Sequence, residues 1–367
     1  MLAVLPWLAI SALTSAGLAL ADPNASSVEG VWDGKVGSMP IRACFNQSEY
    51  GEGFGVYYYN AHLQLIQLRE LKDSSGTYVE GFPWDKDAPQ WRIGKVSDHE
   101  LSGEWRNGGK TLPFRLARTP WLRLAEDETP CSSKLFYEPR LRGIRIAVGT
   151  AEPPDPRYHR LVLEYPDQKD VGVETIELAG KTPAIRQINA QLRKPFEGNP
   201  PEWHECELIA GGGSSSGGWS ESWEPKMFGR KWLSVTRYVE TYCGGPHPDS
   251  WTSSHTYDLQ SGREVDLSKW LNKSVGEAAF RRLLLDASGR GDDADCSEVV
   301  EQSIEGFALD IELRRNGLAF TPNNLPHVVQ ACGDEAFISF AELRPYLSTE
   351  GKRNVVALQA EFAPPKR

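Results

Sequence analysis

The feature that most restricts the fold of this 367-residue chain is a series of short apolar segments between Glu29 and about Leu124. About eight such segments, rich in β-branched and aromatic residues, follow one another at a spacing of roughly ten residues, with glycine and polar turns between them. Parallel strands would need long crossover connections, for which this spacing leaves no room. We therefore predict an all-β antiparallel meander over residues 22–125, closed as a small barrel or a sandwich.

Residues 126–157 contain a concentration of prolines, and we place a Pro-rich domain junction there. The remaining segment, 158–367, mixes helical and strand periodicity, which is typical of an α+β domain with an antiparallel sheet. Thr182 and Pro183 mark the start of one helix, and Ser274-x-x-Glu277 is a capping box that opens another. We predict strands over 144–148, 160–165, 175–178, 206–209, 232–242, 251–259, 307–313, 337–340 and 355–362.

All six cysteines lie beyond residue 21, and their even number predicts three disulfides formed in an oxidising compartment. No two of them have the two-residue spacing of a zinc knuckle or a redox dithiol. The sequence alone permits many connectivities, so we group the cysteines by domain. This grouping pairs Cys44 with Cys131, Cys206 with Cys243, and Cys296 with Cys332.

Residues 1–21 have the character of a signal peptide. They contain no charged side chain, and Ala19-Leu20-Ala21 matches the small-x-small pattern that signal peptidase cleaves. We expect a periplasmic or secreted protein. Because the apolar segment is almost long enough to span a bilayer, an uncleaved anchor is the alternative. Beyond residue 21 no segment approaches that length, so we expect no further membrane contact.

The charge distribution restricts the class of partner. Asp and Glu number 50 against 40 Lys and Arg, and no cluster of basic residues is present, which argues against a nucleic-acid partner. Residues 22–125 carry 13 acidic and 12 basic side chains, whereas 126–367 carry 37 acidic and 28 basic ones, a net charge of −9. The C-terminal part therefore suits a cationic partner.

Three motifs that resemble reactive sites have simpler explanations. Gly213-x-Ser215-x-Gly217 matches a nucleophile elbow, but it lies in a run of glycine and serine with no helix after it, as in a flexible loop. The oxygen-rich segment 286–295 lacks the ligand spacing of a calcium loop. His247 and His255 could approach one another only across a hairpin, where zinc would still need a third ligand. We therefore predict no catalytic residue, no metal and no cofactor.

The candidate binding residues lie after the glycine/serine loop and in the next hairpin. Trp219 and Trp223 would suit a binding edge if exposed, although burial against the sheet is the favoured alternative. His247, Asp249 and Trp251 belong to a hairpin loop, and loops on a rigid scaffold commonly carry recognition. For His247, a hydrogen bond that fixes the turn is the simpler role.

Residues 238–267 read YVETYCGGPHPDSWTSSHTYDLQSGREVDL. This segment resembles the extracellular RsiV-like domain of the lysozyme-sensing anti-sigma factor, which is also the non-catalytic domain of some peptidoglycan deacetylases. The resemblance rests on the Gly-Gly-x-His turn at Gly244–His247, where Pro246 replaces an alanine, and on the turn within Asp258–Leu267. It extends over about 158–348 and implies an α+β fold and a cationic protein partner such as lysozyme.

Together these observations predict an exported, disulfide-stabilised binding protein of the bacterial envelope, with lysozyme or a cell-wall polymer as its ligand. One alternative is a hydrolase of envelope polymers that uses Asp249 and Asp258 near His247, since paired carboxylates can supply an acid and a base. Another is a carrier of a small apolar ligand inside the N-terminal barrel, although a barrel of this size is usually filled by its own side chains. The oligomeric state stays open.

Overall fold

A computed structural model of the chain describes residues 27–47, 53–72, 74–81, 85–123, 128–142, 145–149, 155–164, 171–194, 201–210, 218–244, 247–272, 278–289, 296, 298–299, 302, 309–323, 325 and 327–363. The predicted signal segment, the Ser274-x-x-Glu277 box and the Gly213–Gly217 motif lie outside the described residues. Within the described part, no helix combines the length and the apolar character needed to cross a membrane.

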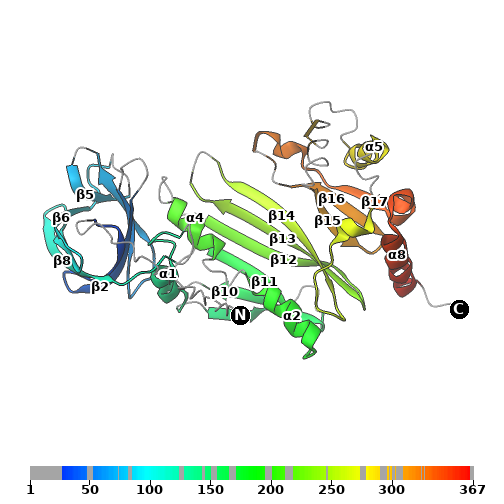
Figure 1. Cartoon of the computed structure of the whole chain (residues 1–367), viewed down its shortest axis with the longest axis horizontal. Coiled ribbons are helices and arrows are strands. Elements are labelled where there is room, and N and C mark those ends of the chain that lie inside the picture. The colour runs from blue at the N-terminus through cyan, green and yellow to red at the C-terminus, as the bar shows by residue number, and fades with distance from the viewer. Residues whose placement is uncertain are drawn as a thin grey trace, which may run out of the picture.

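The N-terminal part is a closed barrel of eight antiparallel strands, which confirms the predicted all-β fold (Figure 1). Each strand pairs with its neighbour in sequence, and β1 closes the barrel on β8, with Val31 opposite Thr119. The strands are β1 (Gly30–Val36), β2 (Met39–Gln47), β3 (Gly53–Tyr59), β4 (Ile66–Leu71), β5 (Ser74–Glu80), β6 (Gln90–Val96), β7 (Glu100–Asn107) and β8 (Lys110–Thr119).

The barrel interior is packed with the protein's own side chains. The ring of Trp91 lies 4.9 Å from that of Tyr57 and 4.6 Å from that of Phe114, measured between centroids. Glu80 borders these rings, and its Oε1 accepts hydrogen bonds from the Tyr57 hydroxyl at 2.6 Å and the Trp91 indole at 3.0 Å. Such packing favours a filled barrel over one that carries a ligand.

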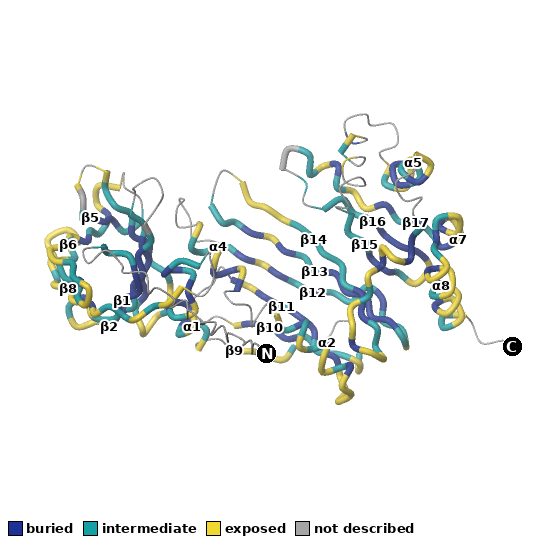
Figure 2. Tube along the Cα trace, viewed as in Figure 1, coloured by how far each residue is buried: buried dark blue, intermediate teal, exposed yellow. Residues whose placement is uncertain are grey.

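The C-terminal part is built on a six-stranded sheet in the order β14-β13-β12-β11-β10-β9. Its pairs are antiparallel except β11 with β12, which is parallel and therefore needs a crossover. Helices α2 (Pro183–Leu192) and α4 (Glu202–Ala210) lie in that crossover. The strands are β9 (Arg145–Gly149), β10 (Tyr158–Glu164), β11 (Val171–Leu178), β12 (Gly218–Phe228), β13 (Trp232–Tyr242) and β14 (Asp249–Asp258). Figure 2 shows buried and less buried residues alternating along β12.

A second, three-stranded sheet in the order β15-β16-β17 packs its edge strand β15 against the other face of β12–β14. Thr236 points away from the α2 and α4 side and donates a hydrogen bond to Glu312 of β15. The added elements confirm the α+β class. They are β15 (Leu309–Arg314), β16 (Gly317–Pro322), β17 (Ala336–Ser339), α5 (Ala278–Ala287), α7 (Phe340–Leu343), α8 (Thr349–Phe362), η1 (Leu267–Trp270), η3 (His327–Cys332) and η4 (Arg344–Tyr346).

The three disulfides have the predicted pairing: Cys44–Cys131, Cys206–Cys243 and Cys296–Cys332. Their presence, with no free cysteine, indicates an extracytoplasmic protein. The first disulfide ties the barrel to the segment before α1 (Lys134–Leu141). This helix was not predicted, because the proline content of 126–157 indicated a domain junction. Arg42 and Tyr58 of the barrel then donate hydrogen bonds to the carbonyls of Leu135 and Phe136 in this helix.

Two predicted strands are wrong, because each is a helix. Residues 206–209 belong to α4, which buries Trp203 and Cys206 against the sheet at a spacing of three residues. Residues 355–362 belong to α8, capped by the Ser348 hydroxyl that accepts from the Gly351 amide at 3.0 Å. In both segments the apolar run is too short to distinguish a helical period from a strand period.

The assignment of residues 355–362 to helix α8 can be tested directly. Leu358 is fully buried, whereas Val356 on the same helix is 66% exposed. Leu358→Ala should lower the free energy of unfolding by about 2–5 kcal/mol through the lost packing, as measured by urea denaturation. Val356→Ala should change it by less than about 0.5 kcal/mol. In a strand the two side chains would share one face, so equal losses from both variants would contradict the helix.

Candidate functional site

Three of the predicted binding residues lie at the disulfide-anchored end of the β13–β14 hairpin. We call the exposed surface formed by Glu240, His247, Asp249 and Ser250, with the half-buried Trp251, the hairpin tip. Cys206–Cys243 fixes this end of β13 to α4. Asp249 accepts hydrogen bonds from the Ser250 amide at 2.8 Å and from the Gln330 side chain at 3.1 Å.

The two other predicted binding residues are buried, as the favoured alternative expected. Trp219 is 5% exposed and Trp223 is 6% exposed, and both lie under the helices on the inner face of β12. Trp219 packs edge-to-face against Trp251 of the hairpin tip, with 5.8 Å between ring centroids. The tip is therefore supported from beneath by a buried indole.

The structure does not bring together the residues of the hydrolase alternative. Asp249 and Asp258 are the first and last residues of β14, roughly 30 Å apart at the usual rise of a strand. Asp258 instead accepts hydrogen bonds from the amides of Gln260 and Ser261 and so fixes the following turn. Among the described residues, no group of three His, Cys, Asp or Glu side chains could hold a metal ion.

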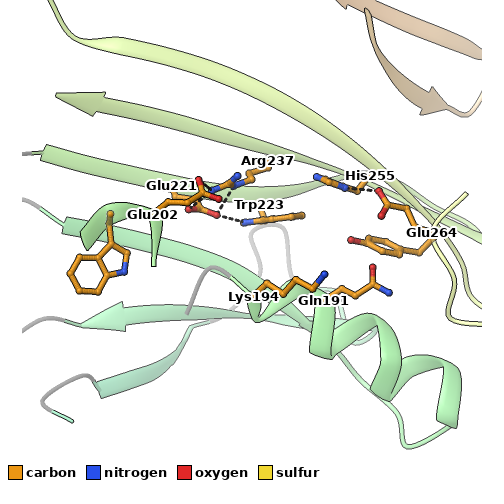
Figure 3. A pocket seen from close by; sticks show the side chains of 10 residues that line it. Gln191, Lys194, Glu202, Glu221, Trp223, Arg237, His255 and Glu264 are labelled. Carbon is orange, nitrogen blue, oxygen red and sulfur yellow. Dashed lines mark hydrogen bonds and ion pairs between the residues drawn. The ribbon is translucent and has the colours of Figure 1, made fainter. Parts of the chain in front are cut away.

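A pocket of about 290 Å³ opens on the face of the six-stranded sheet that carries α2 and α4 (Figure 3). Gln191 in the last turn of α2 and Lys194 just beyond it form the helix side, and Figure 3 shows both side chains directed toward the sheet. The other side is formed chiefly by residues of β12, β13 and β14: Glu221, Trp223, Arg237, His255 and Tyr257.

A buried carboxylate organises one end of the pocket. Glu221 is 3% exposed and its two oxygens accept four hydrogen bonds. Oε1 accepts from Trp223 Nε1 at 2.8 Å and from Arg237 Nε at 2.7 Å, while Oε2 accepts from Trp219 Nε1 at 3.1 Å and from Arg237 Nη2 at 3.0 Å. Its negative charge is thus fully engaged by donors.

Arg237 links this carboxylate to the helix side. Its Nη2 also donates to Glu202 Oε2 of α4 at 2.8 Å. Burial alone would lower the pKa of Arg237, but the hydrogen bonds and charges of Glu221 and Glu202 raise it overall. The guanidinium therefore stays charged and shared between two carboxylates.

The opposite end of the pocket is aromatic. His255 stacks on Trp223, with 5.1 Å between centroids, and lies 6.4 Å from the ring of Tyr257. His255 Nδ1 donates to Glu264 Oε1 at 2.7 Å, and this bond lowers the pKa of Glu264. Burial, with a smaller contribution from Glu264, raises the pKa of Tyr257. The pocket wall thus combines flat rings with carboxylate oxygens.

Sequence reasoning missed most of this pocket. The sequence marks Trp223 as a binding residue only if it is exposed, with burial as the favoured alternative, and it suggests His255 only as a partner of His247. The pattern Trp219-x-Glu221-x-Trp223 places a carboxylate between two indoles on one strand face, which is the signal that could have been used. Arg237 could not have been assigned, because its position depends on the register that pairs it with Trp223.

No protein-family model and no curated protein sequence matches this chain. Two solved structures of DUF3298 family proteins are similar to it. The protein from Pseudomonas aeruginosa PAO1 is 12% identical, with a TM-score of 0.36 over 56% of this chain and 94% of that one. The protein from Bacteroides fragilis is 13% identical, with a TM-score of 0.32 over 59% and 95% of the two chains.

The Glu221 carboxylate should be essential for the stability of the C-terminal part. Glu221→Gln removes the charge that pairs with Arg237, and we expect the free energy of unfolding to fall by about 3 kcal/mol in denaturant titrations. Glu202→Gln is the matched control, because the Glu202 side chain is 57% exposed and its ion pair is worth less than about 1 kcal/mol. Equal losses in the free energy of unfolding for the two variants would contradict this role of the Glu221 charge.

The Glu264–His255 bond should make stability depend on pH. Because the folded-state pKa of Glu264 is depressed, its contribution is present above the unfolded value near 4.5 and is lost as the pH falls through the folded value. Glu264→Gln should therefore be less stable than wild type at pH 6, by under about 1 kcal/mol since the group is half exposed, and the gap should close toward pH 3. A gap that widens on acidification would refute this.

Proposed function

We propose that this protein is an exported binding protein of the bacterial envelope, periplasmic or secreted, whose C-terminal part is an RsiV-like domain. The exposed, acidic hairpin tip supports this proposal most directly. Glu240, Asp249 and Ser250 are exposed at the end of a long hairpin that a disulfide anchors, with Trp251 half-buried beside them. Exposed acidic side chains on a rigid support suit recognition of a basic protein surface.

The partner that we propose is a cationic protein such as lysozyme. Residues 126–367 carry a net charge of −9, which would steer a basic protein toward this part of the molecule. A cell-wall polymer is the second candidate ligand. The hydrolase alternative has less support, since Asp249 and Asp258 lie at opposite ends of β14. The apolar carrier is disfavoured by the packed barrel interior.

Binding to a c-type lysozyme can be measured directly by pull-down and by titration calorimetry. We expect retention at low salt and weaker retention at moderate salt, because exposed charges are screened. Combining Glu240→Gln with Asp249→Asn should weaken binding roughly fivefold to thirtyfold, at about 0.5–1 kcal/mol for each charge. The loss of affinity should arise mainly from a lower association rate constant.

Glu104→Gln is the matched control for each of the two substitutions made singly, because it too removes one negative charge. Glu104 is an exposed carboxylate on β7 of the barrel that pairs with Arg106 of the same strand, away from the hairpin tip. Absence of any retention at either salt concentration would remove the lysozyme proposal. Weakening by the control equal to that of Asp249→Asn alone would show that net charge alone acts.

A further inference from the structure

The pocket between the six-stranded sheet and the ends of α2 and α4 is not used by the protein–protein contact proposed above. Trp251 and the exposed residues of the hairpin tip do not line it. Its walls are preformed, since Glu221, Arg237 and Trp223 are fixed to one another by hydrogen bonds. A concave site with a few convergent polar groups is the usual form of a small-molecule site.

The volume of the pocket limits the size of its ligand. At about 290 Å³, it lies just below the usual range for small-molecule sites, roughly 300–1,000 Å³. A single six-membered ring with its substituents has a suitable size, whereas an extended peptide or a nucleotide does not.

The charges of the pocket are largely compensated before any ligand arrives. Arg237 is shared by Glu221 and Glu202, and Lys194 lies close enough to Glu264 to lower the pKa of that carboxyl. A ligand therefore does not have to bring a strong charge. It meets acceptor oxygens on Glu202 and Glu264, and donors on Lys194 and Gln191, which suit a ligand with several hydroxyl or amide groups.

The rings of the pocket supply the apolar contact. The rings of Trp223 and Tyr257 are nearly parallel to that of His255, with interplanar angles of 28° and 13°. Trp223 and Tyr257 are 6% and 2% exposed, so the partly exposed imidazole of His255 offers most of the aromatic surface. A pyranose ring has an apolar C–H face that packs on such rings and a rim of hydroxyl groups that bond to carboxylates and amides. The exposed imidazole and the polar groups of the pocket are both matched by this class of molecule.

We propose that the pocket binds one uncharged sugar residue, either as a free monosaccharide or at the end of a glycan chain. The sugar packs its C–H face on the exposed part of the His255 ring and of the rings beside it. Lys194 and Gln191 donate to its hydroxyl or amide oxygens from the helix side, and Glu202 and Glu264 accept from its hydroxyl groups. The site holds the sugar without bond cleavage.

The proposal is tested by calorimetry and by saturation-transfer NMR on the full exported chain. The probes are glucose and N-acetylglucosamine as neutral sugars, chitobiose as a glycan end, glucosamine as a cation, N-acetylmuramic acid as an anion and alanine as a small zwitterion. At least one neutral sugar should bind, with a dissociation constant on the order of 1 mM. Tighter binding of chitobiose than of N-acetylglucosamine would identify the glycan end as the source.

Two exposed or half-exposed positions provide variants that leave the fold intact. Lys194→Ala and Gln191→Ala should each weaken sugar binding at least about fivefold without a change in the unfolding midpoint. Arg186→Ala is the matched control, since Arg186 is an exposed residue of the same helix outside the pocket lining, and it should bind as wild type does.

Several outcomes would overturn the proposal. These are no binding of any neutral sugar at about ten times the expected constant, binding of only the charged probes, or sugar binding that Lys194→Ala and Gln191→Ala leave unchanged. Lysozyme retention is measured on the same variants and should be unaffected. A loss of sugar binding alone therefore separates failure of this site from failure of the hairpin tip.

Discussion

The position of helix α4 depends on a buried arginine at the seam between the barrel and the six-stranded sheet. Arg140 of α1 is 1% exposed. Its three donors reach the Leu63 carbonyl at 2.8 Å, His204 Nδ1 at 2.6 Å and Glu207 Oε2 at 2.8 Å. An unpaired charge there would cost several kcal/mol, so folding must bring the loop after β3, α1 and α4 together. Burial and the Arg140 charge lower the pKa of His204, which keeps its imidazole a neutral acceptor.

Because α4 is held on the barrel side, its opposite side can serve as a fixed support for both candidate binding surfaces. Trp203 and Cys206 pack against the sheet, and the disulfide of Cys206 anchors β13 beside the hairpin tip. Glu202 at the start of the same helix pairs with Arg237 in the pocket. The barrel thus helps to fix α4, and the Gln67 side chain of β4 donates a further hydrogen bond to the Glu207 carbonyl.

Local signals predicted the elements that depend on local physics. The strand 232–242 and the helix start at Thr182, whose hydroxyl accepts from the Ile185 amide at 3.2 Å, follow from alternation and capping. The strand predictions for 206–209 and 355–362 failed because a short apolar run does not distinguish a strand from a buried helix. The pocket could not be predicted for a different reason. Glu221 and Arg237 meet through strand register, and α2 meets β14 only through the crossover, neither of which a single sequence specifies.

The two candidate surfaces share one buried carboxylate. Glu221 holds the indole of Trp223, which forms the pocket wall, and the indole of Trp219, on which Trp251 of the hairpin tip packs. A displacement of either indole would leave a buried N–H donor unpaired, which costs about 1–3 kcal/mol. Both surfaces are therefore preformed, and a ligand that fits them loses little binding energy to rearrangement. The charged side chains of the pocket are largely paired with one another, so a ligand in the proposed sugar site would meet mainly the remaining lone pairs of the carboxylates and the Lys194 side chain.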